Sequence, residues 1–146
     1  AQTVHHLVAD LEDNGIPLIS LAIFLDIMVK NISYGCDFAG LGTSGLAINK
    51  LVKKVPKLKC QHLFSCDTSK ASRNFIQYTD PPDSWHGNIL DRDHSLLPTG
   101  FSLYSFTSPC QGLSAAGKQC GADDVRSQLI LTSLVVIERT RPKTFI

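Results

Sequence analysis

Short apolar runs of strand length alternate with helix-like segments along most of this chain, and that alternation constrains the fold more than any other feature. Strand-like runs lie at 32–38, 61–66, 85–89 and 101–106, and residues 144–146 have the composition of the start of a fifth. Helices are expected between them at 46–52, 68–77 and 122–139. Strands that alternate with helices are typical of crossover units, which pair strands in parallel. We therefore predict an α/β fold with a mostly parallel sheet.

The expected helices have recognisable ends and faces. Pro56 is expected to end the helix over 46–52, and Thr68 or Ser69 is expected to cap the helix over 68–77. The apolar side of the last helix is expected to consist of Val125, Leu129, Leu131, Val135 and Val136. Right-handed crossovers would bring the carboxyl ends of the strands to one side of the sheet, where ligands bind in such folds.

A glycine-rich turn lies between the first strand and the helix that follows it. Gly40, Gly42 and Gly45 fall within eight residues, FAGLGTSG at 38–45. Glycines allow the backbone to turn sharply and to approach a ligand closely. No Gly-Lys-Ser/Thr sequence follows, so the turn does not fit a phosphate-binding P-loop. It suits a nucleoside cofactor without a pyrophosphate, such as S-adenosylmethionine, and a plain strand-to-helix turn is the alternative.

Asp67 directly follows the second predicted strand. A carboxylate at the end of that strand can accept hydrogen bonds from both hydroxyls of a ribose. The alternative is a surface carboxylate without a ligand. Together with the glycine-rich turn, Asp67 indicates a site for a nucleoside.

Cys110 lies just beyond the apolar run at 101–106, between Pro109 and Gln111. A buried structural cysteine would normally lie inside such a run, whereas a cysteine at its exit is presented to a cleft. The residues from Gly112 to Gly121 are mostly small or polar, and a glycine-bearing loop of this kind can close over a ligand. If Cys110 is considered without its surroundings, the alternative is an inert cysteine with no chemical role.

In this order, these segments resemble the DNA cytosine-5 methyltransferases. The matching segments are FAGLGTSG at 38–45, LFSCD at 63–67, GNI at 87–89, SPCQGLSAAGKQ at 108–119, ADDVRSQLI at 122–130 and RPKTFI at 141–146. The most specific part is Pro-Cys-Gln followed by the Ser-x-x-Gly-Lys-Gln segment. The resemblance covers about residues 32–146. It implies a Rossmann-like methyltransferase fold that uses S-adenosylmethionine and acts on DNA.

The resemblance also implies roles for individual residues. Cys110 would attack C6 of a flipped cytosine as a thiolate, so that C5 becomes nucleophilic enough to take a methyl group. The expected contacts to the substrate are Pro109, Gln111, Ser114, Lys118 and Arg126. The expected contacts to the cofactor are Phe38, Gly40, Leu41, Gly42, Asp67, Asn88 and Ile89.

Three positions depart from the family pattern. Asp37 precedes Phe38 where an apolar residue is usual, Asn88 stands where the family has an aspartate near the adenine amine, and Asp67 stands where glutamate is commoner. An amide oxygen still accepts the hydrogen bond of the adenine amine, more weakly. The departures therefore bear on how tightly a cofactor binds.

The family places a Glu-Asn-Val segment after the strand that begins at 144, and the sequence ends at Ile146. Residues 32–146 are therefore expected to be the first half of a catalytic domain with an incomplete sheet, inactive alone. A non-enzymatic structural subunit built on such a half-domain is the alternative, and an RNA methyltransferase of the same fold is also left open. The intact cysteine loop favours the enzyme.

Residues 1–31 are expected to form a helical extension. The segment 16–29 within it is strongly apolar but is interrupted by Asp26, and it is short for a membrane span of about 20 residues. We expect a partner protein that either completes the sheet or docks on this apolar segment.

Composition adds few constraints. The formal net charge of +1 predicts neither a nucleic acid nor a membrane as partner by itself. Five cysteines form no Cys-x-x-Cys pair, which indicates reduced thiols in a nucleus, cytoplasm or organelle matrix. Asp91, Asp93 and His94 are expected to lie in a solvated loop and to bind no metal.

Overall fold

A computed structural model describes residues 31–55, 58–108 and 125–146. The strands are β1 (Ile32–Asp37), β2 (Cys60–Cys66), β3 (Ser84–His86), β4 (Leu103–Phe106) and β5 (Thr144–Phe145). The helices are α3 (Thr43–Lys54), α4 (Lys70–Thr79), the 3-10 turn η1 (His94–Leu96) and α5 (Val125–Thr140). The expected helical extension at 1–31, its apolar segment 16–29 and the end of a helix at Pro56 lie outside these residues.

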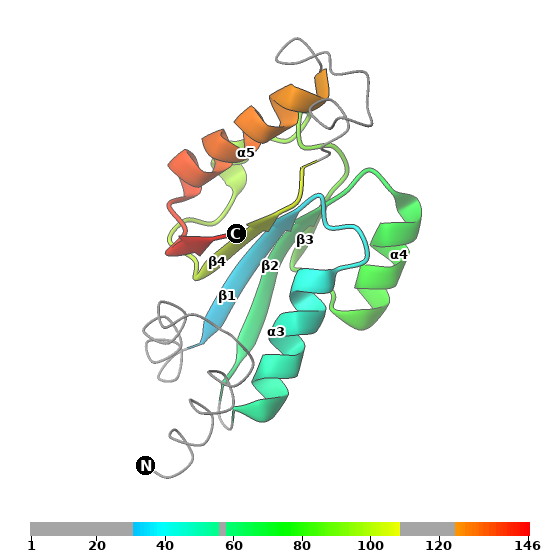
Figure 1. Cartoon of the computed structure of the whole chain (residues 1–146), viewed down its shortest axis with the longest axis vertical. Helices are drawn as coiled ribbons and strands as arrows, with labels where there is room; N and C mark the ends of the chain where they lie inside the picture. Colours follow the sequence, from blue (N-terminus) through cyan, green and yellow to red (C-terminus); the bar gives the residue numbers. More distant parts are fainter. Residues whose placement is uncertain (1–30, 56–57, 109–124) are drawn as a thin grey trace, which may run out of the picture.

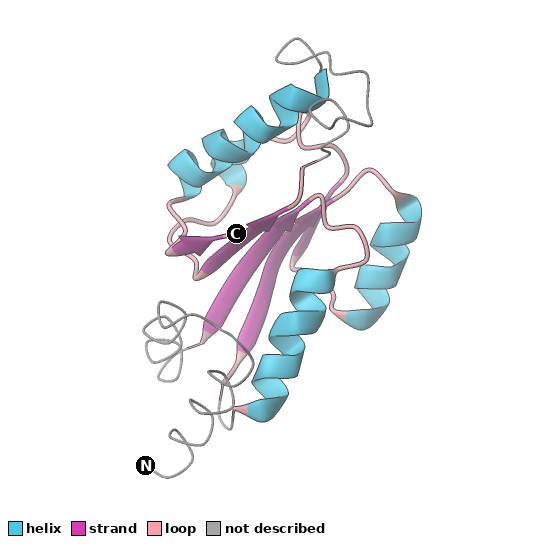
Figure 2. Cartoon of the chain, viewed as in Figure 1, coloured by secondary structure: helices cyan, strands magenta, loops and turns pink. Residues whose placement is uncertain are grey.

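The five strands form one parallel sheet in the order β3-β2-β1-β4-β5 (Figures 1 and 2). Helices α3 and α4 cover one face of the sheet, and α5 covers the other. The predicted α/β fold with a parallel sheet is therefore confirmed. The strand order reverses direction between β1 and β4, and such a switch point opens a crevice at the carboxyl ends of the strands.

The third strand is shorter than predicted. It ends at His86 rather than at 89, because the chain turns at Asn88. The Asn88 side chain accepts a hydrogen bond from the amide of Leu90 at 3.1 Å, and the Asn88 carbonyl accepts one from the amide of Asp91 at 3.2 Å. This local turn satisfies the backbone groups that a longer strand would pair.

The apolar side predicted for the last helix is partly wrong. Val136 is fully buried and Leu129 packs against the core, but Leu131 is 61% exposed and Val135 is 40% exposed. The buried side includes Ser133 and Thr140, whose spacing from Val136 follows the helical period. Their hydroxyls donate to carbonyls one turn earlier, at 3.2 and 2.7 Å, so these polar side chains are buried without losing hydrogen bonds.

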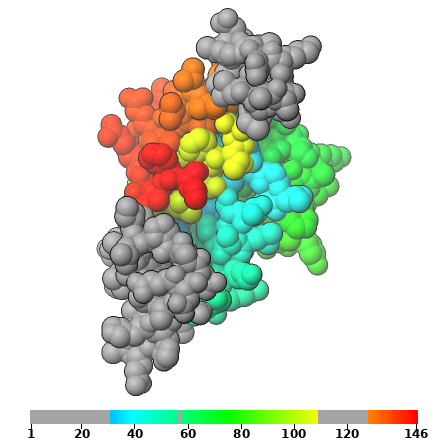
Figure 3. Space-filling view, viewed as in Figure 1, coloured from blue at the N-terminus to red at the C-terminus, as the bar shows by residue number. Residues whose placement is uncertain are grey.

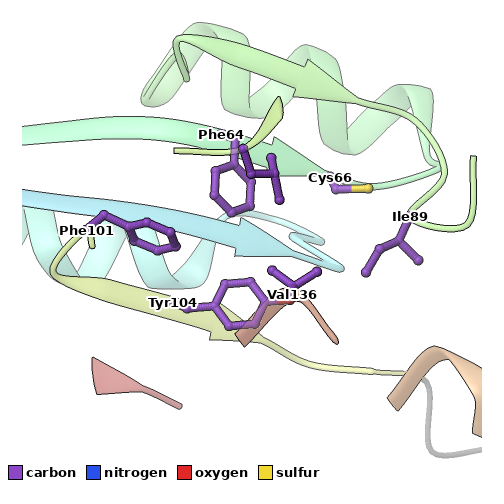
Figure 4. Close-up of a cluster of buried hydrophobic side chains, with 7 residues drawn as sticks. Phe64, Cys66, Ile89, Phe101, Tyr104 and Val136 are labelled. Atoms are coloured by element: carbon purple, nitrogen blue, oxygen red, sulfur yellow. The ribbon is translucent and has the colours of Figure 1, made fainter. Parts of the chain in front are cut away.

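A bulge in β2 sets which side chains face each helix layer. Tyr34 pairs with His62 but the next residue, Gly35, pairs with Phe64, so Leu63 is an extra residue in β2. Phe64 therefore points to the α5 face, where it is fully buried near Tyr104 and Val136 (Figure 4). Gly35 lies so close to the Phe64 ring that a Cβ there would overlap it.

The last strand lies at the edge of the sheet. Hydrogen bonds from Thr144 to Ser102 and from Ile146 to Tyr104 attach it to β4. Phe145 is 56% exposed. The C-terminal end of the chain, red in Figure 3, lies at the surface. Within the described part of the chain, no helix is long and apolar enough to cross a membrane.

Candidate functional site

Four strands end at the same pocket. Phe38, Asp67, Gly87 and Thr107 are the first residues after β1, β2, β3 and β4 respectively, and all four line a pocket of about 320 Å³. The other lining residues are Cys66, Thr68, Asn88, Ile89 and Leu129. Because the strands are parallel and adjacent, their carboxyl ends bring side chains from distant parts of the chain together.

Phe38 has a backbone conformation that is uncommon for a residue with a side chain. Its φ is +54°, in the left-handed region. Hydrogen bonds hold both sides of the residue: the Ala39 amide donates to the Cys66 carbonyl at 3.1 Å, and the Thr107 hydroxyl donates to the Phe38 carbonyl at 3.1 Å. The strands on either side of β1 thus stabilise a strained residue at the pocket, a common feature of functional sites.

Asp67 holds the glycine-rich turn in place. One carboxylate oxygen accepts the Gly40 amide at 2.8 Å, and the other accepts the Ser69 amide at 2.8 Å. Gly40 and Gly42 have φ values of +51° and +68°, which favour glycine. Asp67 therefore joins this turn to the start of α4, where Ser69, one of the two predicted caps, is the N-cap. Each oxygen can accept a second hydrogen bond, because a carboxylate has about four acceptor positions.

The residues that follow β3, from Gly87 to Ile89, form another wall of the pocket. Ile89 is 2% exposed and belongs to the core below α5, and Figure 4 shows it near Cys66, toward the carboxyl ends of the strands. The Asn88 amide donates to Asp91 at 3.0 Å and its oxygen accepts from Leu90. The side-chain orientation of Asn88 is thus set by its own turn.

Not every residue expected to contact the cofactor lines this pocket. Phe38, Asp67, Asn88 and Ile89 do, whereas Leu41 is 65% exposed and is absent from the lining. Gly40 and Gly42 are not in the lining either, and Gly40 is connected to the site through Asp67.

The expected catalytic and substrate-contacting residues fall mostly outside the described part of the chain. These residues are Cys110, Pro109, Gln111, Ser114 and Lys118, together with the loop 112–121 and the helix start at 122. Arg126 belongs to the first turn of α5, and its side chain is also outside that part. Thr107, the first residue after β4 and three residues before Cys110, nevertheless lies at the pocket.

A buried ion pair lies at the switch point between β1 and β4. Two Arg92 nitrogens donate to the two oxygens of Asp37, each at 2.7 Å, and the Tyr104 hydroxyl donates to Asp37 at 2.6 Å. Burial by itself lowers the pKa of Arg92, but the hydrogen bonds and charge of Asp37 outweigh that effect and raise it. Burial, and then the charge of Asp37, raises the pKa of Tyr104. Asp37, which departs from the family pattern, is therefore a buried and fully paired carboxylate.

The cysteines of the described residues are free thiols that favour the protonated form. Burial raises the pKa of Cys66 to about 12 and those of Cys36 and Cys60 to about 11. Although Cys66 lines the pocket, a thiol with such a pKa is a poor nucleophile at neutral pH.

Several site residues were missed by sequence reasoning. Thr107, Gly87 and Thr68 line the pocket, and each lies within two residues of the end of a strand, so the strand ends were the available signal. Arg92 carried no such signal, because it stands in the polar stretch DRDH. No cluster of metal-ligating side chains occurs among the residues that the structure describes.

The five-stranded parallel sheet and the pocket at its switch point are consistent with a Rossmann-like methyltransferase fold. The sequence model of the family described as C-5 cytosine-specific DNA methylase matches residues 38–146. The chain therefore belongs to this family, as its sequence motifs predicted.

Individual relatives agree with this assignment. The chain is similar to Type II methyltransferase M1.ScrFI of Lactococcus lactis subsp. cremoris, with 33% identity over 75% of this chain and 26% of that protein. It is 31% identical to Type II methyltransferase M.PspPI of Psychrobacter sp. (strain TA137), over 75% of this chain and 25% of the relative. M.HpaII of Haemophilus parainfluenzae is 29% identical over 74% of this chain and 28% of its own length. The chain spans about a quarter of the length of these curated relatives.

Proposed function

We propose that this protein takes part in the transfer of a methyl group from S-adenosylmethionine to C5 of cytosine in DNA, with the strand-end pocket as the cofactor site. The convergence of Phe38, Asp67, Gly87 and Thr107 on one pocket carries the proposal. Membership of the cytosine-specific DNA methylase family and the methyltransferase names of the relatives support it.

The chemistry of the pocket suits this cofactor. Its volume of about 320 Å³ lies within the usual range for small-molecule sites. Phe38 and Ile89 offer apolar contact to the adenine and methionine parts, and Asp67 offers acceptors for the ribose hydroxyls. The Asn88 oxygen offers an acceptor for the adenine amine. When bound, S-adenosylmethionine supplies an electrophilic methyl group.

Cys110 is the proposed nucleophile. Its thiolate would form a bond to C6 of the flipped cytosine, and the electron pair of the C5–C6 double bond would move toward C5. After C5 gains the methyl group, loss of the C5 proton would restore the double bond and release the thiolate. Pro109, Gln111, Ser114, Lys118 and Arg126 are the proposed contacts to the DNA. The poor nucleophilicity of Cys66 leaves this task to a cysteine outside the pocket wall.

For these 146 residues alone, we propose cofactor binding without turnover. The relatives named as methyltransferases are about four times as long as the region that they share with this chain. Grip on a duplex and base flipping require a few kcal/mol of binding contacts, which a larger protein supplies.

Calorimetric titration with S-adenosylmethionine tests the cofactor site. A Cβ at Gly87 would meet nothing within 4 Å, so Gly87→Leu adds to the pocket wall a side chain whose first carbon lies in open space. We expect binding by the wild-type chain and its loss in Gly87→Leu. Gln77→Leu, at an exposed position of α4, is the matched control and should bind normally. Equal binding by all three would show that the cofactor lies elsewhere.

Covalent trapping tests the nucleophile. A duplex with 5-fluorocytosine holds the adduct, because fluorine cannot leave C5 as a proton does. The assay uses a chimaera that adds the parts of M1.ScrFI that this chain does not cover. We expect an adduct that Cys110→Ser abolishes and the control Cys120→Ser retains. Cofactor binding by the chain without any adduct in the chimaera would favour the non-enzymatic subunit, and trapping on RNA alone would favour an RNA methyltransferase.

A further inference from the structure

We propose that Arg92 and Asp37 form a positioning pair that sets the distance between the two walls of the cofactor pocket; this inference rests on the proposed function of that pocket. Neither residue lines the pocket. Each is joined through the chain to a residue that does. Asp37 immediately precedes Phe38, and Arg92 follows Ile89 by three residues.

The geometry of the pair is directional and rigid. The guanidinium presents two nitrogens to the two oxygens of Asp37, both at 2.7 Å, and its third nitrogen donates to His94 Nδ1 at 3.3 Å. The guanidinium also lies 5.3 Å from the centre of the Phe64 ring, which is fully buried. Paired forks of this kind fix orientation as well as distance. The loop that carries Ile89 is therefore bound to the end of β1 at one defined separation.

A third element joins the same carboxylate. Tyr104 of β4 donates its hydroxyl to Asp37 at 2.6 Å, and Thr107, which lines the pocket, lies three residues beyond Tyr104. One buried carboxylate thus gathers β1, β4 and the loop after β3, the segments that supply Phe38, Thr107 and Ile89. The side chains of Asp37 and Arg92 are 0% and 2% exposed, so water does not compete for these bonds.

Stability alone does not account for such a pair. Replacing both members of a buried ion pair with apolar side chains of similar volume is often neutral or stabilising. Because Tyr104 also donates to Asp37, the double substitution Asp37→Leu/Arg92→Met is made in a Tyr104→Phe chain, so that no buried hydroxyl loses its acceptor. A structural role then predicts that the double substitution leaves both stability and cofactor affinity as they are in Tyr104→Phe. A positioning role predicts that stability is kept and affinity is lost, because apolar side chains do not fix an orientation.

The experiment measures three quantities on the 146-residue chain: the thermal midpoint, the affinity for S-adenosylmethionine, and the amide hydrogen exchange of 38–42 and 87–91. Both segments contain amides with defined acceptors, such as Gly40 and Leu90. Relative to Tyr104→Phe, we expect the double variant to have an unchanged or raised midpoint, affinity lower by about tenfold or more, and faster exchange in these two segments but not in α3. Arg92→Lys, which keeps the charge and loses the fork, should change affinity and exchange in the same direction.

Val55→Ala is the control for general destabilisation. Val55 is 2% exposed at the end of α3 remote from the pocket, so its truncation should lower the midpoint and leave affinity unchanged.

Two unchanged results together would overturn the proposal: affinity and exchange of the double variant equal to those of Tyr104→Phe, and affinity and exchange of Arg92→Lys equal to those of the wild type. If the double variant does not fold, the cofactor affinity and the amide exchange of Arg92→Lys decide whether the pair has a positioning role. If the wild-type chain binds no cofactor, the proposed function fails, and exchange alone decides the pair: faster exchange confined to the two segments supports positioning, and any other pattern refutes it.

Discussion

Asp67 should contribute to the stability of the fold and to cofactor affinity through separate bonds. Its two oxygens accept the amides of Gly40 and Ser69, both at 2.8 Å. A hydrogen bond to a charged group contributes about 1.5–3 kcal/mol, and an unsatisfied buried donor costs about 1–3 kcal/mol. The Ser69 amide is exposed, so water replaces Asp67 there. The partly buried Gly40 amide therefore dominates, and Asp67→Ala should lower the free energy of unfolding by about 1–3 kcal/mol.

The assay is urea unfolding with linear extrapolation to water. Asp67→Asn keeps one carbonyl acceptor, which can serve the partly buried Gly40 amide while the side-chain NH2 group faces the exposed Ser69 side. The loss in Asp67→Asn should therefore be no larger than that in Asp67→Ala. Asp83→Ala is the matched control: Asp83 accepts one exposed hydrogen bond from Gln61 at 2.7 Å, and its loss should stay within about 0.5 kcal/mol. An Asp67→Ala value as small as that of the control would refute the role of Asp67 in holding the turn.

Cofactor affinity is measured on the same variants. If Asp67 also accepts the ribose hydroxyls, Asp67→Ala should weaken S-adenosylmethionine binding by about 1.5–3 kcal/mol, roughly 10-fold to 150-fold. The titration is run where the variant is fully folded, so that lost stability does not enter the affinity. Loss of stability with unchanged affinity would assign Asp67 to the turn alone.

Three further outcomes follow from the buried polar groups. Gly45→Ala should destabilise the protein in thermal unfolding despite the better helix propensity of alanine, because the new Cβ would overlap the Asp80 carboxylate and the Tyr34 hydroxyl; equal or higher stability would contradict the packing. Burial lowers the pKa of His62 below its usual 6.5, although Asp80 opposes this, so the unfolded chain binds a proton that the folded chain does not. The stability that this shift gives is present above pH 6.5 and lost as pH falls below it, and urea midpoints should show a smaller acid loss in His62→Gln. Cys66, with a pKa of about 12, should resist iodoacetamide at pH 8 in the folded state, and rapid labelling seen by mass spectrometry would contradict that value.

The alternation of strand-like and helix-like segments was sufficient to predict the parallel sheet, because both faces of such a sheet are covered and its strands are short apolar runs. The same reasoning placed Phe38 and Asp67 at strand ends, and both line the pocket. It extended β3 too far, because Asn88 supports a local turn that hydropathy does not register. It also wrongly assigned Leu131 and Val135 to the buried side of α5. The helical period places Ser133, Val136 and Thr140 there instead, and the two hydroxyls are buried because they donate to carbonyls of the same helix.

Other features depended on contacts between distant residues. The bulge at Leu63 becomes visible only when β2 is aligned with β1, and it decides that Phe64 faces α5. Arg92 stands among charged residues that are typical of a solvated loop, yet it is buried because it pairs with Asp37, 55 positions earlier at the end of β1, which β2 separates from β3. Long-range pairing of this kind leaves no local pattern in the sequence.

A titration of the ¹⁵N-labelled chain with S-adenosylmethionine, followed by amide NMR shifts, tests whether the strand-end pocket is the cofactor site. We expect saturable shifts at the four residues that follow the strands, Phe38, Asp67, Gly87 and Thr107, with little change at the exposed strand β5. These amides come from four separate parts of the chain, so their joint response would place the cofactor at the carboxyl ends of the sheet. The absence of shifts at saturating cofactor, or shifts confined to residues away from these four, would refute this cofactor site.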